Sequence, residues 1–339
     1  MIIRVCHFTE QGETIEQRLI AAWEDAIFQV RSKEVTLTKW VQEGFERRLP
    51  ILFIGACGIA VRSIAPFVKD KLEDSPVLVM DEQGRFVIPV LSGHMGGANF
   101  LAEKIAGMLG AQAVVTTATD VERVFSVDEF ARQNGFEILE REGIKRISSK
   151  LLRGEEIRVA ISPQLLCDGG LPDGLIWVPF ETPSVDLRIL TRQDIEQIKE
   201  AHWEQALRLV AKEIVIGVGC KKGKSFAELQ DFLLRHCPYD LEKEIYAITS
   251  IDLKKKEEGL WGIAQYYHIP FITYSAQELQ KVQGDFSQSA FVQEVTGVSN
   301  VCERAALCLA NGGELLQGKI AENGMTLAIA RRIPKIRVW

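Results

Sequence analysis

The sequence predicts an α/β fold made of three α/β units, in which the sheets are mostly parallel and the first unit also holds a β-hairpin. Short apolar runs, typical of buried strands, alternate with helical patterns along the chain. Several of these runs end in small residues, as strands do where an α/β sheet binds a ligand. We expect the units to span residues 1–120, 121–212 and 213–339, because shorter elements begin after residue 120 and a long helical pattern ends at residue 212.

In the first unit, strands and helices follow one another in the order that a parallel sheet requires. The exception is a hairpin between residues 77–80 and 85–91, since Gly84 can adopt the positive φ of its turn. A short helix ends near Pro66, whose ring blocks the preceding turn. The expected strands are 2–8, 51–54, 77–80, 85–91 and 113–116, and the expected helices are 14–30, 37–48, 59–67 and 98–109.

The second unit has no cluster of titratable residues, so we interpret it as structural. The third returns to the alternation of the first. Basic residues near the end of the chain, Arg331, Arg332, Lys335 and Arg337, are interpreted as solvated charges at a sheet edge. For both units together, the expected strands are 157–161, 175–178, 245–249, 271–274, 319–320, 327–330 and a strand from residue 214, and the expected helices are 127–133, 144–152, 192–212, 226–236, 260–267 and 300–310.

Composition narrows the class of protein. Of the 339 residues 47% are hydrophobic and 25% charged, and the net charge is −6, so we expect no basic field for nucleic acid. The seven cysteines are scattered, without the spacing of a zinc or redox site, and are expected to be buried. For Cys57 the alternative to burial is a thiol nucleophile that works with His94. The first residues turn polar too early for a signal peptide, and no apolar run has membrane-spanning length. We therefore expect a cytoplasmic protein without a metal site of its own.

The most informative stretch is the segment from Leu91 to Asn99, which reads LSGHMGGAN. Three glycines around His94 let the backbone approach a ligand, and the helix that follows is expected to aim free N–H groups at the same place. An imidazole titrates near neutral pH, which makes His94 a candidate general base. The alternative is a tight turn between strand and helix with an incidental histidine.

Two other glycine loops are candidates. Gly55 and Gly58 follow an apolar run and allow a close turn. The loop between Gly219 and Gly223 resembles a phosphate cradle, but it has three residues between the glycines where the nucleotide-binding motif has four. Two interpretations stay open: an anion site made of backbone N–H groups with Lys221, Lys222 or Lys224, or a solvated basic loop.

Several motifs in this order resemble one family. GACGIAVRSIAP from Gly55, LSGHMGGAN from Leu91 and TTATD from Thr116 are similar to the N-terminal domain of cobalamin-biosynthesis protein G, the cobalt-precorrin-5A hydrolase family. GVGCKKG from Gly217, SIDLKKKEEGL from Ser250 and GVSNVCERAAL from Gly297 are similar to its C-terminal domain. The resemblance covers both ends of the chain, with a weaker middle.

The resemblance implies a hydrolase of the anaerobic route to vitamin B12. It would open the δ-lactone of cobalt-precorrin-5A and release the C20 two-carbon unit as acetaldehyde, giving cobalt-precorrin-5B. Cobalt would arrive within the substrate, so no cofactor is expected, and neighbouring corrin-pathway enzymes are possible partners. Two other classes stay open: a non-catalytic carrier of corrinoid intermediates, and a nucleotide-dependent enzyme that uses the loop at 217–225.

For such a reaction the sequence offers a base, oxyanion donors and cations. His94 and Asp120 are the catalytic candidates, and the N–H groups of Gly96 and Gly97 are candidate oxyanion donors. Arg62 and Lys71 either bind substrate carboxylates or pair with Asp70 or Asp81, and Asp120 either acts as a base or caps the next segment. The substrate-binding candidates are Gly55, Gly58, Arg62, Lys71, Ser92, Gly93, Gly96, Gly97, Asn99, Thr117, Gly219, Lys221 and Lys222.

Overall fold

The computed structural model describes residues 1–70, 73–94, 96–116, 124–197, 206–287, 293–294 and 296–337. The chain divides into two compact units. The first comprises Met1–Thr117, Gly223–Ala227 and Lys256–His268, and the second comprises Ala118–Lys222, Glu228–Lys255 and Ile269–Trp339. The α/β class is confirmed, while the domain boundaries after residues 120 and 212 stay predictions.

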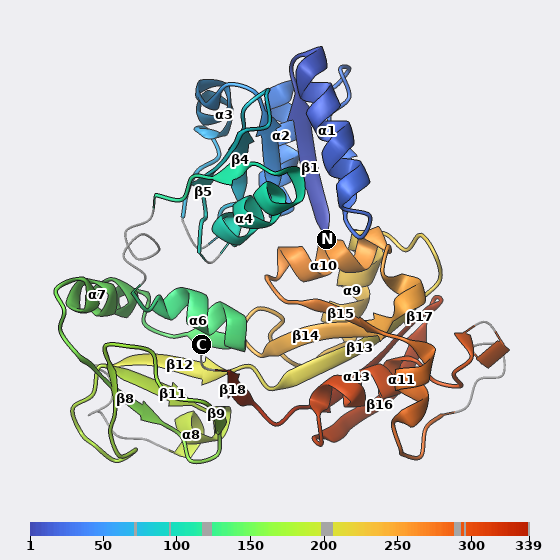
Figure 1. Ribbon diagram of the computed structural model, residues 1–339. Helices are drawn as coiled ribbons and strands as arrows, with labels where there is room; N and C mark the ends of the chain where they lie inside the picture. The colour runs from blue at the N-terminus through green and yellow to red at the C-terminus, as the bar shows by residue number, and fades with distance from the viewer. Residues whose placement is uncertain are drawn as a thin grey trace. The chain divides into compact units, whose positions relative to one another are not determined.

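The first unit is built on a sheet with strand order β2-β1-β3-β4-β5-β6, and Figure 1 labels its strands β1, β4 and β5. Strands β1 to β4 pair in parallel, β5 runs antiparallel to β4, and β6 runs parallel to β5. The expected hairpin is confirmed, and Gly84 in its turn has a φ of 66°. The strands are β1 (Ile2–His7), β2 (Ile27–Val30), β3 (Ile51–Ile54), β4 (Val77–Met80), β5 (Phe86–Leu91) and β6 (Gln112–Ala113).

Helices cover both faces of this sheet. Helices α1 (Glu10–Ala22) and α4 (Ala98–Leu109) bury their apolar side chains on one face, where Ile3 and Val5 point. Helices α2 (Leu37–Glu46) and α3 (Cys57–Ile64) pack on the other, against Cys6 and Phe53. Each strand therefore contributes alternate residues to two cores, which is why these runs are apolar throughout.

The expected helix at 14–30 is wrong in its second half. Helix α1 ends at Ala22, the chain turns with a hydrogen bond from the Ala26 N–H to the Trp23 carbonyl oxygen, and Ile27–Val30 pairs with β1. Ala26 and Val30 continue the four-residue spacing of the helix, so periodicity does not reveal the break. Sheet pairing decides the conformation there instead.

The second compact unit, which comprises Ala118–Lys222, Glu228–Lys255 and Ile269–Trp339, holds a sheet of order β10-β8-β11-β12-β7. Among the described strands of this sheet, only the β12–β7 pair is antiparallel. The expected helix at 192–212 is wrong at its end, since α8 is described as Arg192–Gln197 and Leu207–Ala211 is a strand. Strands β7, β9 and β11 were not predicted. The elements are α6 (Val127–Asn134), β7 (Phe136–Ile138), α7 (Arg141–Leu152), β8 (Ile157–Ile161), β9 (Leu166–Asp168), β10 (Leu175–Trp177), β11 (Leu187–Leu190), α8 and β12 (Leu207–Ala211).

The chain from residue 214 builds a sheet of order β15-β14-β13-β17-β16. The expected strand, glycine loop and helix from residue 214 are confirmed as β13 (Ile214–Cys220) and α9 (Phe226–His236). Strand β18 (Lys335–Arg337) pairs with β9. The other elements are β14 (Ile245–Ile251), a 3-10 turn (Asp252–Lys254), α10 (Glu258–Tyr266), β15 (Phe271–Tyr274), α11 (Ala276–Lys281), α13 (Cys302–Ala310), β16 (Glu314–Glu322) and β17 (Met325–Arg331).

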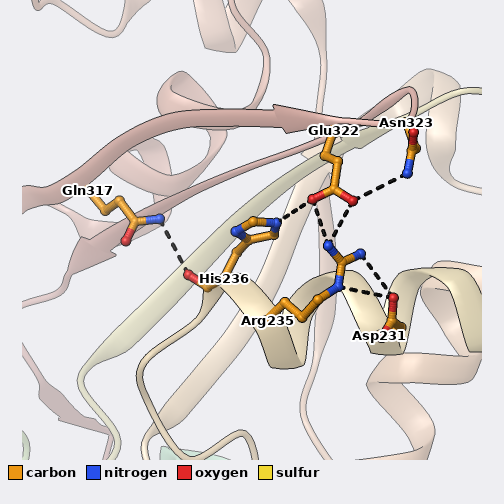
Figure 2. Close-up of polar contacts among 6 residues, drawn as sticks. All are labelled: Asp231, Arg235, His236, Gln317, Glu322 and Asn323. Carbon is orange, nitrogen blue, oxygen red and sulfur yellow. Dashed lines mark hydrogen bonds and ion pairs between the residues drawn. The ribbon is translucent and has the colours of Figure 1, made fainter.

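Two contacts fix this sheet to its helices. A Cβ on Gly217 of β13 would lie 1.8 Å from the carbonyl oxygen of Cys302, so α13 packs directly on the strand backbone. At the end of α9, Arg235 Nη1 donates to both oxygens of Glu322 at 2.7 Å, and His236 Nε2 lies 2.7 Å from Glu322 Oε2 (Figure 2). Glu322 belongs to β16, so this exposed cluster joins the helix to the β16–β17 hairpin.

Candidate functional site

The glycine–histidine loop and the Gly55–Gly58 turn lie at opposite edges of the first sheet. Gly55 follows the end of β3, at the edge where the parallel strands finish. Strand β5 runs the other way, and its last residue, Leu91, pairs with Val77 at the start of β4. The loop after Leu91 therefore lies where β1, β3 and β4 begin. Strand β6 is parallel to β5 and ends at Ala113, beside Val87, so the chain after it heads in the direction of that edge.

The glycine–histidine loop folds back onto the start of α4. The N–H groups of Gly97, Ala98 and Asn99 donate to the carbonyl oxygens of His94, Ser92 and Gly93, at 3.0, 3.1 and 3.1 Å. The expectation of free N–H groups at this helix start is therefore wrong for these three residues. The Gly97 N–H in particular is already engaged, so of the two expected oxyanion donors Gly96 is the one that stays a candidate.

Close packing explains two of the glycines. A Cβ on Gly93 would lie 2.6 Å from Oδ1 of Asn99, and one on Gly96 would lie 2.5 Å from Cβ of Ser92. Gly97 has room for a side chain but a φ of 81°, which favours glycine for conformational reasons. The loop thus has one compact shape, and that shape places the half-buried His94 between Gly93 and Gly96.

Ser92 is the strained residue of the loop. Its φ of 56° lies in the left-handed region, which residues other than glycine, Asn and Asp rarely adopt. The residue is 6% exposed, and its buried hydroxyl has no hydrogen-bond partner in the part of the chain that the structure describes. Strain and unsatisfied polar atoms of this kind gather at functional sites.

Three of the expected site residues, Lys71, Thr117 and Asp120, lie outside the described residues. Residues 114–116, which precede the last two, follow β6, which runs in the same direction as β5. The catalytic role of Asp120 and the binding roles of Lys71 and Thr117 therefore stay predictions.

The opposite edge carries the Gly55–Gly58 turn. Gly55 has a φ of 153°, and a Cβ there would lie 2.8 Å from the ring of Phe8. Arg62 is exposed on α3, and within the described residues it makes no ion pair with Asp70 or Asp81. Cys57, expected to be buried, is exposed at the first residue of α3. Cys57 is exposed because it begins the helix beyond the edge of the sheet.

Sequence reasoning missed a histidine at this second edge. His7 ends β1, and its Nδ1 lies 2.9 Å from Oε2 of Glu16, a buried residue of α1. The order β2-β1-β3 makes the β1–β3 boundary the point where chain connections diverge, a common ligand-binding position in α/β sheets. The sequence does contain a sign of this pair. Glu16 lies between Gly12 and Leu19 on the buried face of α1, where a carboxylate needs a partner.

The loop after β13 is held by its own neighbours. A Cβ on Gly219 would lie 2.6 Å from Oγ1 of Thr326, and the Lys221 N–H donates to the Gly324 carbonyl oxygen at 2.8 Å. Lys222 is exposed. In the first unit, the Gly223 N–H donates to Oε1 of Glu257 at 2.6 Å. A carboxylate of the protein thus occupies an N–H that a phosphate cradle would need, which weakens the nucleotide interpretation.

Comparison with known proteins gives the family. A model described as cobalamin synthesis G N-terminal matches residues 39–120, and one described as cobalamin synthesis G C-terminus matches residues 214–330. A protein of Salmonella typhimurium named cobalt-precorrin-5A hydrolase is 35% identical over 301 residues, which are 85% of this chain and 83% of that protein. This chain belongs to the cobalamin synthesis protein G family.

Another relative with the same name, from Priestia megaterium, is 32% identical over 84% of this chain and 79% of its own length. A solved structure of a cobalamin biosynthesis protein G homolog from Sulfolobus solfataricus covers 97% of this chain and 96% of that one, at 22% identity and a TM-score of 0.43. The resemblance stated from the motifs is confirmed.

The two cobalamin synthesis G models include most of the candidate residues. The N-terminal match contains the Gly55–Gly58 turn and the glycine–histidine loop, and the C-terminal match contains Gly219–Lys222. His7 and Glu16 precede the first match. Among the described residues, no three His, Cys, Asp or Glu side chains form a group that could hold a metal ion, and no helix is long and apolar enough to cross a membrane.

Proposed function

We propose that this chain is a cobalt-precorrin-5A hydrolase, which opens the δ-lactone of its substrate and releases acetaldehyde to give cobalt-precorrin-5B. The observation that carries the proposal is the 35% identity over 85% of the chain with a protein of that name. The compact glycine–histidine loop supports it, because a half-buried imidazole held by a strained backbone suits proton transfer.

In the first step, water adds to the lactone carbonyl while His94 takes one of its protons. The oxyanion that forms accepts a hydrogen bond from the Gly96 N–H, an interaction worth about 3 kcal/mol in comparable sites. The tetrahedral intermediate then collapses, the ring C–O bond breaks, and the imidazolium returns the proton to the leaving oxygen. The products of this step are a carboxylic acid and a free hydroxyl on the C20 substituent.

In the second step, a base removes the proton of that hydroxyl, and the alkoxide becomes the carbonyl of acetaldehyde. The C–C bond to C20 breaks, its electron pair passes into the conjugated macrocycle, and a proton restores neutrality. His94 or Asp120 is the base for this step. Cobalt is part of the substrate, and we propose that no further cofactor takes part.

The substrate carries acetate and propionate arms, which call for cations. Arg62 is exposed and suits two-oxygen contact with a carboxylate, while Lys71, Lys221 and Lys222 act as point charges. Ser92, Gly93 and Asn99 stay the expected contacts of the macrocycle at the sheet edge that carries His94. Gly55 and Gly58 lie at the opposite edge, so their binding role, like those of Thr117 and Gly219, stays a separate prediction. We place the activity in the cytoplasm, where neighbouring corrin-pathway enzymes would supply the substrate and receive the product.

The test is incubation of the purified chain with cobalt-precorrin-5A. A hydrolase releases one acetaldehyde per substrate consumed, detected by coupled reduction, and the lactone disappears from the mass spectrum. A carrier binds the substrate and leaves the lactone intact. A nucleotide-dependent enzyme requires ATP for turnover. Intact lactone after binding, or dependence on ATP, would overturn the proposal.

A further inference from the structure

A groove of about 560 Å³ lies in the second unit, beside the residues that follow strand β17. Its walls come from the end of β17 with the residues that follow it and from helix α8. They include Arg192, Arg331 and Arg332. The volume is within the range of small-molecule sites. The interpretation of Arg332 as a solvated edge charge is wrong, because this side chain is buried. The groove shares no residue with the loops described above.

Arg332 presents two buried donors that lack an acceptor. The residue is 7% exposed, and its Cζ lies 3.5 Å from the centroid of the Tyr246 ring. Its Nε and Nη2 atoms have no hydrogen-bond partner among the described residues. In a guanidinium, the N–H bonds of these two nitrogens point the same way and match two oxygens of one carboxylate or phosphate. A planar or tetrahedral oxyanion is therefore the group that this geometry fits.

Of the carboxylates nearby, Glu137 and Glu314 are engaged with other donors, and Glu196 lines the groove as an exposed side chain. Glu137 accepts a hydrogen bond from Arg192 Nη2 at 2.5 Å, and Glu314 accepts one from Arg331 Nη1 at 2.9 Å. Glu213 lines the groove, but its Oε1 accepts from the backbone N–H of Arg192 at 3.3 Å. Burial raises the pKa of the Glu213 carboxyl group, which weakens it as a counter-ion. The positive charge of Arg332 is thus left without an ion pair in the described part of the chain.

We propose that this groove binds the oxyanion of a carboxylate or phosphate ligand, held by Nε and Nη2 of Arg332 with Arg331 adding charge at the rim. Both nitrogens are shielded from bulk water, so binding requires a rearrangement of the groove wall that exposes them to the anion. The anion comes either from a carboxylate arm of a tetrapyrrole or from a free ion such as phosphate. The site does not depend on the proposed hydrolase activity.

Titration calorimetry of the full chain with inorganic phosphate and, separately, with the octacarboxylate uroporphyrin III tests the proposal. Saturable binding of at least one probe is expected. Uroporphyrin that displaces phosphate identifies a tetrapyrrole arm as the ligand, and binding of phosphate alone identifies a free ion. Arg332→Lys keeps the charge but loses the paired donors, so it is expected to weaken binding at least tenfold. Glu213→Gln keeps the shape of a groove side chain whose charge the proposal does not use, and it is expected to bind the anion at least as tightly as wild type.

Two further variants keep the test decisive. Arg331→Gln changes a side chain that is 50% exposed, so it folds even if Arg332→Lys does not, and it is expected to weaken binding two- to fivefold. Arg153→Gln removes an exposed arginine that pairs with Glu155 outside the groove, and it should bind like wild type. Absence of saturable binding for both probes, or wild-type affinity in the Arg331 and Arg332 variants, would overturn the proposal.

Discussion

Ser92 and Gly96 lie so close together that a Cβ on Gly96 would sit 2.5 Å from Cβ of Ser92 and 2.7 Å from its carbonyl oxygen. Ser92 meanwhile holds a φ of 56°, and its hydroxyl has no partner among the described residues. The loop that carries His94 therefore holds Ser92 in a strained backbone conformation and leaves no room for a side chain at Gly96.

Ser92→Gly is expected to separate strain from function. Glycine adopts a positive φ at no steric cost, so the free energy of unfolding should rise by about 1 kcal/mol in a denaturant titration. The same change removes the hydroxyl, and kcat/KM should fall about tenfold or more. Ser92→Ala is the matched control, since it loses the hydroxyl but keeps the strain. Wild-type activity in both variants would remove Ser92 from the site.

Gly217→Ala is expected to destabilise the sheet built from residue 214 onward. The new Cβ would lie 1.8 Å from the Cys302 carbonyl oxygen, so α13 must move away from β13, at a cost of about 3 kcal/mol. Gly107→Ala on α4 is the control, because no atom lies within 4 Å of its Cβ position and alanine favours the helix by about 0.5–1 kcal/mol. Thermal denaturation should show opposite shifts, and equal shifts would contradict the packing described.

Asp81→Asn is expected to change how the free energy of unfolding depends on pH below neutrality. Burial by itself would raise the pKa of Asp81, but hydrogen bonds from the N–H groups of Phe86, Arg85 and Gln83 outweigh it and hold the pKa below its usual value. The folded state therefore prefers the charged form. The resulting stabilisation is complete above the unfolded pKa and is lost as the pH falls through the folded pKa.

At neutral pH the asparagine variant should lose about 1 kcal/mol of unfolding free energy relative to wild type. Denaturant titrations between about pH 7 and pH 3 should show this difference shrinking as the carboxyl group is protonated. A difference that stays constant over that interval would mean that Asp81 does not ionise differently in the folded chain.

The strands with a strong apolar pattern could be predicted from the sequence, and the places where pattern and pairing disagree could not. Val30 continues the spacing of Ile15 and Leu19, yet it lies in β2 because β1 offers an unpaired edge there. Leu207–Ala211 likewise follows a helical pattern and forms β12. Local periodicity is short-range information, whereas strand pairing depends on partners far away in the chain.

For the candidate site, the motifs could be found in the sequence, but the sheet edge at which each of them lies could not be predicted. The hairpin that reverses β5 was predicted, and its consequence is that the loop around His94 lies at the opposite edge from Gly55. Arg332 was assigned to solvent because charged residues near a chain end are ordinarily exposed. The partner of His7 could have been suspected from Glu16, a carboxylate on an otherwise apolar helix face.

The central claim is that His94 moves the proton in lactone opening, and single-turnover acetaldehyde release tests it most directly. His94→Gln should slow the release at least a hundredfold without loss of fold. His236→Gln, which alters a histidine of the Arg235–Glu322 cluster outside the candidate site, should leave the rate within about threefold of wild type. A His94→Gln variant as fast as wild type would contradict the account.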